Sequence, residues 1–318
     1  MQIRTVAAPA KINLTLDVLE RLPNGYHRLA MIMQTIGLSD TIRLEQQADG
    51  ISLACEDQRI SGSRGTVGCL AGTAEACGSP DTDPIPLDAG NLAWRAAEAF
   101  FARLGDSAGA PDHRPHGVHI RLTKRIPSAA GLAGGSADAA AVLRGLNDMY
   151  GFPFAADELA AIGVRLGADV PYCLRGGTCL AEGIGELLTP LPSFAGHWLV
   201  LVKPPFPVPT PWVFGRLRLD DLGERPDTAA MCRLVAAGEL AGVAAGMRNV
   251  LERVTEPVHP EITAIRECMR ALGALGSRMS GSGPSVFGLF ADEAAARKAQ
   301  ASLVAEWPAC WVVPTVDG

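Results

Sequence analysis

The sequence predicts a protein of mixed α-helices and β-strands. Apolar and polar residues alternate at positions 12–18, which is typical of a half-buried strand. Positions 91–100 instead place their apolar residues on one face of a helix. A third segment, residues 118–147, joins a short strand to a helix through a glycine-rich loop. These three patterns require both kinds of secondary structure within the first half of the chain.

Local signals place the elements of this first half. Asn24 and Gly25 form a turn pair, and Asp157 and Gly167 suit the N-cap and the end of a helix. Residues 55–90 are rich in Gly, Ser, Thr, Asp and Pro, so we expect a long surface insertion there. The first expected elements are a pattern of paired strands at 2–20 and a strand at 41–45, followed by the insertion. After the insertion we expect a helix from 91, a strand at 118–122, helices at 137–147 and 157–166, and a strand at 172–180.

A domain boundary is expected near Pro190 and Pro192, where the pattern changes. One domain then covers residues 1–191 and a second covers residues 192–318, and 318 residues suffice for two domains of ordinary size. In the second domain we expect a strand at 198–202, a proline-rich loop at 204–211, helices near 228–237 and 261–272, a glycine-rich loop at 277–285, a strand at 286–290 and a helix at 292–306.

Composition and charge exclude two classes of partner. The net charge is −6 and the pI is near 5.6, so the sequence gives no basic signal for nucleic acid, and we expect no such partner. No segment reaches the roughly 20 apolar residues of a membrane helix, so we expect no membrane partner. The first residues also lack the apolar stretch of a secretory signal. We therefore expect a cytoplasmic protein.

The cysteines and histidines predict neither a disulfide framework nor a metal site. The eight cysteines include no C-x-x-C pair, so we expect reduced thiols that pack as small apolar groups. His113, His116 and His119 are close in sequence. Pro115 prevents a continuous helix there, and the strand expected from Val118 separates the side chains, so we expect no metal bound by them.

The glycine-rich loop at residues 127–137 is a candidate phosphate site. Glycine has no Cβ, so backbone N–H groups can approach an anion closely. The following helix adds free N–H groups and a partial positive charge at its N-terminus. We expect Ser136 at the helix N-cap, where its hydroxyl group can contact a phosphate. The loop matches neither a Walker A loop nor a G-x-G-x-x-G loop, and a flexible turn before an Ala-rich helix is the alternative.

Lys11 and Asp169 are candidates for the chemistry of phosphate transfer. Lys11 is a lone cation in an alternating strand, and Asp169 lies in a short bend before Pro171. Phosphoryl transfer needs positioning, cations on the phosphate and often a carboxylate that accepts the proton of the alcohol. Taken alone, Lys11 also fits a solvated strand face, and Asp169 also fits a turn.

Tyr26 and His27 follow the turn at Asn24 and Gly25. An aromatic ring and an imidazole in this place can stack on a flat ligand such as a nucleobase and hydrogen-bond to it. A packed tyrosine beside a surface histidine explains the same pair equally well.

Together these segments resemble the GHMP kinase superfamily, and most closely its 4-diphosphocytidyl-2-C-methyl-D-erythritol kinase family. The resemblance covers nearly the whole chain. It implies a two-domain α+β fold, with a first domain like domain 2 of ribosomal protein S5 and a ferredoxin-like second domain. The segments that carry it are Pro9-Ala-Lys-Ile-Asn-Leu14, Asn24-Gly-Tyr-His27, residues 127–137, Leu166-Gly-Ala-Asp-Val-Pro171, Ala181-Glu-Gly-Ile-Gly185 and Ser280-Gly-Ser-Gly-Pro284.

The resemblance also implies an activity and its catalytic residues. The activity is ATP-dependent phosphorylation, with Mg²⁺, of the 2-hydroxyl group of a small cytidylyl-linked methylerythritol in the non-mevalonate isoprenoid pathway. Asp169 would be the base for that hydroxyl group, Lys11 would orient it, and the loop at 281–283 would support the phosphate loop. The residues expected to hold the ATP phosphates are Pro127, Ser128, Ala129, Ala130, Gly131, Leu132, Ala133, Gly134, Gly135, Ser136 and Ala137.

For the substrate, the resemblance implies contacts from two places in the chain. Tyr26 and His27 would recognise the cytosine, with Asn13 nearby. Phe206 and Thr210, in the proline-rich loop, would close over the same base.

The loop departs from the family in one respect that has a structural consequence. Ala129, Ala130 and Ala133 stand at positions that are usually glycine, and we expect a negative φ at Ala133 because a methyl group is disfavoured at positive φ. No carboxylate stands out as a ligand for Mg²⁺, so we expect ATP itself to hold most of the metal.

Two other interpretations stay open. One is a GHMP kinase with a different acceptor, such as phosphomevalonate. The other is a non-catalytic relative that keeps the fold, and the presence of both Lys11 and Asp169 argues against it.

Overall fold

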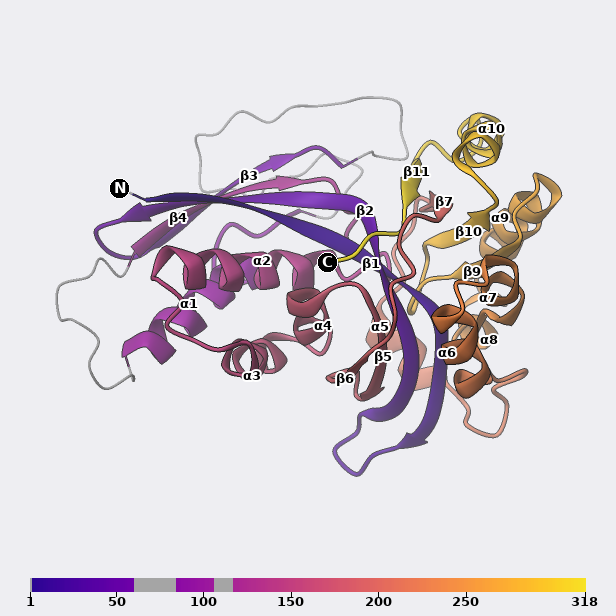
Figure 1. Cartoon of the computed structure of the whole chain (residues 1–318), viewed down its shortest axis with the longest axis horizontal. Helices are drawn as coiled ribbons and strands as arrows, with labels where there is room; N and C mark the ends of the chain where they lie inside the picture. Colours follow the sequence, from indigo (N-terminus) through magenta and orange to yellow (C-terminus); the bar gives the residue numbers. More distant parts are fainter. Residues whose placement is uncertain (1, 60–83, 106–116) are drawn as a thin grey trace.

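The computed structural model describes residues 2–59, 84–105 and 117–318, which form two β-sheets flanked by helices (Figure 1). The strands of the first, seven-stranded sheet are β1 (Ile3–Arg21), β2 (His27–Gln47), β3 (Ile51–Asp57), β4 (Gly117–Lys124), β5 (Thr178–Gly183), β6 (Leu187–Pro190) and β8 (Arg248–Asn249). Their order is β3-β4-β2-β1-β8, and β5 pairs with both β2 and β6.

The second sheet has four strands, all antiparallel to their neighbours. They are β7 (Trp198–Val202), β9 (Gly276–Met279), β10 (Val286–Phe290) and β11 (Cys310–Pro314), in the order β11-β7-β10-β9. The chain passes from the first sheet to the second between β6 and β7, but β8 returns to pair in parallel with β1. The strands expected at 198–202 and 286–290 are confirmed.

The helices are divided between the two sheets. They are α1 (Leu92–Gly105), α2 (Gly134–Met149), α3 (Ala156–Leu166), α4 (Val170–Arg175), α5 (Thr210–Arg216), α6 (Thr228–Ala236), α7 (Leu240–Gly246), α8 (Glu252–Thr255), α9 (Pro260–Ala271) and α10 (Glu293–Leu303). Figure 1 shows α1 to α4 together on one face of the first sheet, whereas α9 and α10 pack on the second sheet. The helices expected from 91, near 228–237, near 261–272 and from 292 are confirmed.

Strand β1 is buried on both faces along its middle, although its alternating pattern predicted one solvated face. Ile12 and Leu14 belong to a cluster of buried side chains that includes Leu199 and Phe287 of the second sheet. A register shift between Asn13 and Thr15 interrupts the alternation. The expectation of a half-buried strand was therefore wrong, because the second half of the chain covers the other face.

Two further expectations about local structure were wrong. Helix α3 begins at Ala156, and its N-cap is Ala155, two residues before the expected Asp157; Glu158 accepts a hydrogen bond of 3.1 Å from the Ala155 N–H group there. Residues 172–180 are not one strand. Helix α4 begins at Val170 with Pro171 in its first turn, two glycines with positive φ, Gly176 and Gly177, follow it, and then β5 begins.

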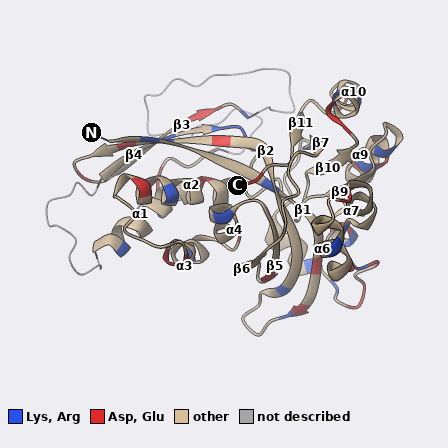
Figure 2. Cartoon of the chain, viewed as in Figure 1, with Lys and Arg blue, Asp and Glu red and all other residues tan. Residues whose placement is uncertain are grey.

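The stretch expected to be an insertion, residues 55–90, lies largely outside the described residues, as do Cys69, Cys77, His113 and His116. Its first three residues belong to β3. In the described part of the chain, no helix is long and apolar enough to cross a membrane. Figure 2 shows Lys and Arg interspersed with Asp and Glu over the described elements.

Candidate active site

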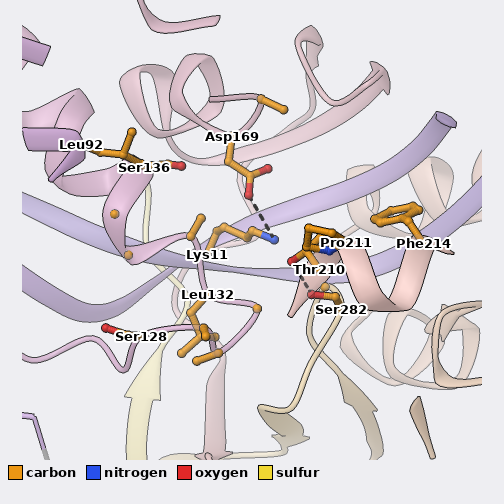
Figure 3. Close-up of a pocket in the computed structure, with 18 of the residues that line it drawn as sticks. Lys11, Leu92, Ser128, Leu132, Ser136, Asp169, Thr210, Pro211, Phe214 and Ser282 are labelled. Atoms are coloured by element: carbon orange, nitrogen blue, oxygen red, sulfur yellow. Dashed lines mark hydrogen bonds and ion pairs between the residues drawn. The ribbon is translucent and has the colours of Figure 1, made fainter. Parts of the chain in front are cut away.

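A cavity of about 1090 Å³ lies where the two halves of the chain meet. The first half contributes β1, the glycine-rich loop before α2 and the start of α4, and the second half contributes α5 and the second glycine-rich loop. In Figure 3 the side chain of Lys11 points toward Asp169, and Thr210 lies beside Ser282. The cavity therefore brings together segments that are up to 271 positions apart in the sequence, from position 11 to position 282.

The glycine-rich loop ends in an uncapped helix. Helix α2 begins at Gly134 after the N-cap residue Ala133, and within the described residues no side-chain hydrogen bond caps its N-terminus. Ser136 is thus the third residue of the helix and not its N-cap, which corrects the expectation from the sequence. Because the first N–H groups of a helix have no intrahelical partner, this end of α2 is suited to an anion.

Two alanines of this loop adopt left-handed backbone conformations. Ala133 has φ 57° and Ala129 has φ 47°, so the negative φ expected at Ala133 was wrong. Each such conformation costs about 1 kcal/mol relative to glycine. The contacts around the loop must therefore hold it in this shape.

The second glycine-rich loop provides such contacts. The Ser280 hydroxyl group donates a hydrogen bond of 2.9 Å to the Gly131 carbonyl group, and the Ser285 N–H group lies 3.4 Å from the Ala130 carbonyl oxygen. Gly131 has φ 73°, and a Cβ atom there would lie only 2.1 Å from the Ser280 carbonyl oxygen. The two loops pack backbone against backbone, and this packing requires glycine at position 131.

Lys11 and Asp169 face each other across the cavity. The Lys11 ammonium nitrogen lies 3.8 Å from a carboxylate oxygen of Asp169, and it donates a hydrogen bond of 2.7 Å to the Asn13 side chain. The Lys11 side chain is 6% exposed, whereas that of Asp169 is 32% exposed. The backbone N–H group of Lys11 also donates to the Leu132 carbonyl group. A buried cation thus lies between the glycine-rich loop and an accessible carboxylate.

At the other end of the cavity lies an aromatic pair. The rings of His27 and Phe214 stack with centroids 5.1 Å apart and planes 28° apart. Burial, and then the charge of Arg21, lowers the pKa of His27 below 6.5. Tyr26 also lines this end and is 58% exposed. A neutral imidazole and two aromatic rings form a surface on which a flat ring can stack.

The structure brings most of the expected site residues to the cavity wall, but not all of them. Lys11, Tyr26, His27, Asp169, Thr210 and residues 127–136 line the cavity. Asn13 is fully buried behind Lys11, and Ala137 is buried in α2. Phe206 stacks on His259, with centroids 4.3 Å apart, and is not part of the cavity lining.

Sequence reasoning missed several lining residues. Phe214 comes eight residues after Phe206 and replaces it as the aromatic of the second half that lines the cavity. Ile85 also lines it, although residues 55–90 were assigned to a surface insertion, and Leu92, expected only on one face of a helix, lines it too. One signal for Phe214 was present, because α5 begins with Thr210 and Pro211 and therefore places position 214 one turn further along the same face.

Thr210 connects the aromatic end of the cavity to the second glycine-rich loop. Its hydroxyl group and that of Ser282 are 2.8 Å apart and share a hydrogen bond. Asn249 fixes the same loop from behind, because its side-chain amide donates to the carbonyl groups of Met279 and Gly281, at 2.9 and 2.8 Å. The loop therefore has defined contacts on both sides.

Comparison with known proteins identifies the family. Residues 91–177 match the GHMP kinases N terminal domain, and residues 229–309 match the GHMP kinases C terminal domain. The chain is 42% identical over 317 residues to a 4-diphosphocytidyl-2-C-methyl-D-erythritol kinase of Acetivibrio thermocellus, and the match covers 99% of this chain and 100% of the relative.

Solved structures agree with this match. A crystal structure of 4-(cytidine 5'-diphospho)-2C-methyl-D-erythritol kinase has a TM-score of 0.75 and 34% identity, and the match covers 99% of this chain and 100% of the other. A homoserine kinase from Cytophaga hutchinsonii, at 18% identity and a TM-score of 0.71, shares the fold, with coverage of 100% and 95%. The predicted α+β fold with GHMP kinase N- and C-terminal domains is confirmed. The chain belongs to the 4-diphosphocytidyl-2-C-methyl-D-erythritol kinase family of the GHMP kinases.

Proposed function

We propose that this protein is a kinase that transfers the γ-phosphoryl group of ATP to the 2-hydroxyl group of 4-diphosphocytidyl-2-C-methyl-D-erythritol. The observation that carries the proposal is the 3.8 Å approach of Lys11 to Asp169 beside the open N-terminus of α2. One cavity thus holds an anion site, a cation and a carboxylate, with an aromatic surface at its far end.

In this proposal Asp169 accepts the proton of the substrate hydroxyl group. The hydroxyl oxygen then forms a bond to the γ-phosphorus atom, and the bond from that phosphorus to the β-phosphate oxygen breaks, which releases ADP. The Lys11 ammonium group, fixed by Asn13, orients the hydroxyl group and stabilises the negative charge of the transferred group.

The loop fits a nucleotide phosphate for two structural reasons. The first N–H groups of α2 have no side-chain cap from the described residues, and Gly131 has no Cβ atom that would crowd the backbone of the second loop. We assign residues 127–136 to this role, and Ala137 supports it from within the helix. ATP supplies the phosphoryl group, and Mg²⁺ neutralises charge on its phosphates.

Mg²⁺ fits as a metal that enters with the nucleotide. The described residues contain no cluster of three or more His, Cys, Asp or Glu side chains that is suited to a metal ion. Magnesium in kinases is commonly held by one or two protein groups together with substrate phosphates.

The cytosine of the substrate would bind at the aromatic end of the cavity. Tyr26, His27 and Phe214 supply ring surfaces there, and the lowered pKa of His27 keeps its imidazole neutral near pH 7, able both to donate and to accept a hydrogen bond. In this assignment Asn13 acts through Lys11, and Phe214 takes the role that the sequence suggested for Phe206.

The domain division at residues 191 and 192 remains our proposal. It is supported by the end of β6 at Pro190 and the start of β7 at Trp198. The expected cytoplasmic location and the absence of a nucleic-acid partner stay predictions.

The substrate is tested by ADP release from purified protein with MgATP and a panel of acceptors. The panel contains 4-diphosphocytidyl-2-C-methyl-D-erythritol, phosphomevalonate, mevalonate and homoserine. We expect turnover with the cytidylyl compound alone. Turnover with a different acceptor would support the proposed kinase activity but reject the proposed substrate. No ADP release with any acceptor would reject both the activity and the substrate.

A further inference from the structure

A buried charged cluster lies beneath the phosphate loop and has no part in the chemistry described above. Lys124 at the end of β4 donates hydrogen bonds to Asp40 of β2 and, at 2.6 Å, to Asp138 of α2. The exposed fractions of Lys124, Asp40 and Asp138 are 5%, 0% and 2%. Three ionisable side chains from three elements therefore meet in the protein interior.

The cluster is connected to both ends of the loop. Asp40 accepts hydrogen bonds from the backbone N–H groups of Arg125 and Ile126, where the loop leaves β4. Asp138 lies in the first turns of α2, where the loop ends. The cluster thus fixes the distance between the two ends of the loop.

The Lys124 ammonium group is also close to the phosphate-binding end of α2. A Cβ atom on Gly134, the first residue of that helix, would lie 3.1 Å from the Lys124 nitrogen. Lys124 and Asp138 both border the cavity. Their charges therefore act on an anion at the helix N-terminus through few intervening atoms, from side chains that are themselves buried.

One oxygen of the cluster has no hydrogen-bond partner among the described residues. Asp138 Oδ1 is buried and receives no hydrogen bond from any described residue, whereas Oδ2 accepts from Lys124. A buried carboxylate oxygen without a donor disfavours the ionised form. A carboxyl group in this setting can gain or lose a proton when the nearby charge changes.

We propose that Lys124 is a positioning residue for the ATP phosphates and that Asp138 sets the net charge beneath them. Lys124 and Asp40 together are neutral. An ionised Asp138 adds one negative charge that repels the phosphates, and a protonated Asp138 adds none. This inference rests on the proposed use of the loop as the ATP site.

The pKa of Asp138 lies close to neutral pH. Burial raises its pKa to about 7, against the attraction of Lys124 and with the repulsion of Asp40. Burial disfavours the charged form of Lys124, but Asp138 and Asp40 outweigh it and raise the pKa of Lys124, so this group stays charged. The thiol of Cys173 in α4 also interacts with Asp138, and its own pKa is raised so far by burial that it stays neutral.

The proposal predicts that nucleotide binding weakens as the pH rises through 7. Below this pH Asp138 is protonated and the cluster is neutral, and above it the added negative charge opposes the phosphates. Binding of MgADP by calorimetry should have a dissociation constant about fivefold higher at pH 8 than at pH 6. Asp138→Asn keeps the shape and cannot ionise, so it should lose this fivefold difference, keep only the pH dependence of the nucleotide itself, and bind at pH 6 much like the wild type.

The nucleotide's own ionisation is the same for both proteins, so their comparison isolates Asp138. An Asp138→Asn variant that keeps the wild-type pH dependence would overturn the proposal. If the variant does not fold, calorimetry of the wild type at pH 7 in two buffers of different ionisation enthalpy decides. Proton uptake on MgADP binding, beyond that of the nucleotide, supports the proposal, and no uptake overturns it. Failure to bind MgADP at any pH would instead contradict the assignment of the loop to ATP.

Discussion

The hydroxyl group of Ser280 donates a hydrogen bond of 2.9 Å to the carbonyl group of Gly131, and this bond joins the two glycine-rich loops of the protein. Gly131 belongs to the loop that we assign to the ATP phosphates, and Ser280 begins the loop that contacts Thr210 through Ser282. The position of the phosphate loop therefore depends on a segment nearly 150 residues away in the sequence, from Gly131 to Ser280.

Replacing Gly131 with alanine should separate these loops. The new Cβ atom would lie 2.1 Å from the Ser280 carbonyl oxygen, and the φ of 73° adds about 1 kcal/mol of backbone strain. We expect the KM for ATP to rise by about tenfold or more, together with a lower melting temperature. Gly151→Ala is the control, because its φ is 77° but no atom of the described residues lies within 4 Å of the new atom. Equal effects of the two variants on KM would show that the loop contact has no role.

Replacing Phe214 with leucine should weaken binding of the cytidylyl substrate. An aromatic stacking contact contributes about 0.5–1.5 kcal/mol, so we expect its KM to rise by about three- to tenfold with little change in the KM for ATP. Phe206→Leu is the matched control, because Phe206 stacks on His259 and does not line the cavity. If Phe206→Leu raised the substrate KM and Phe214→Leu did not, the assignment of Phe214 would be wrong.

The pKa of His27 gives a prediction for acid pH. Burial, and then Arg21, lowers this pKa below 6.5, so the imidazole becomes charged only in more acidic solution. We expect kcat/KM for the cytidylyl substrate to fall as the pH falls through this pKa. Arg21→Gln removes the second cause, and the pKa of His27 followed by NMR should move up toward 6.5. An unchanged His27 pKa in this variant would exclude the contribution of Arg21.

Asp138 gives a separate prediction for stability. Its pKa is about 7 in the folded chain, and its ordinary value of 3.8 applies to the unfolded chain. Between these pH values the folded protein therefore binds more protons than the unfolded chain. The free energy of unfolding should therefore fall as the pH rises from 4 to 7. Asp138→Asn lacks this dependence, so its stability relative to the wild type should increase over that range in chemical denaturation. A constant difference between the two proteins would contradict the raised pKa.

The sequence predicted those parts of the site that depend on short segments. The strand with Lys11, the bend with Asp169 and the glycine-rich loop each have a local signal, and all three reach the cavity. The backbone of the loop was not predictable in the same way. Ala133 adopts φ 57° because contacts from residues 280–285 hold the loop in this shape. The local preference of alanine for negative φ would exclude that conformation.

The role of Phe206 shows a second limit. Phe206 and Phe214 are both aromatic residues near the same proline-rich segment, and nothing in their immediate sequence tells which one faces the cavity. That choice depends on how α5 packs against His27 of β2, a contact between residues far apart in the chain. The burial of both faces of β1 was missed for the same reason, because the covering residues Leu199 and Phe287 come 187 and 275 residues after Ile12.

The central claim is that Asp169 takes the proton of the substrate hydroxyl group while Lys11 holds the reacting groups in place. It is tested most directly by single-turnover phosphoryl transfer with MgATP and 4-diphosphocytidyl-2-C-methyl-D-erythritol, comparing the wild type with Asp169→Asn. The account predicts that the transfer rate falls by about 10²–10⁴-fold while MgADP still binds with similar affinity. A variant that transfers the phosphoryl group within a few-fold of the wild-type rate would contradict it.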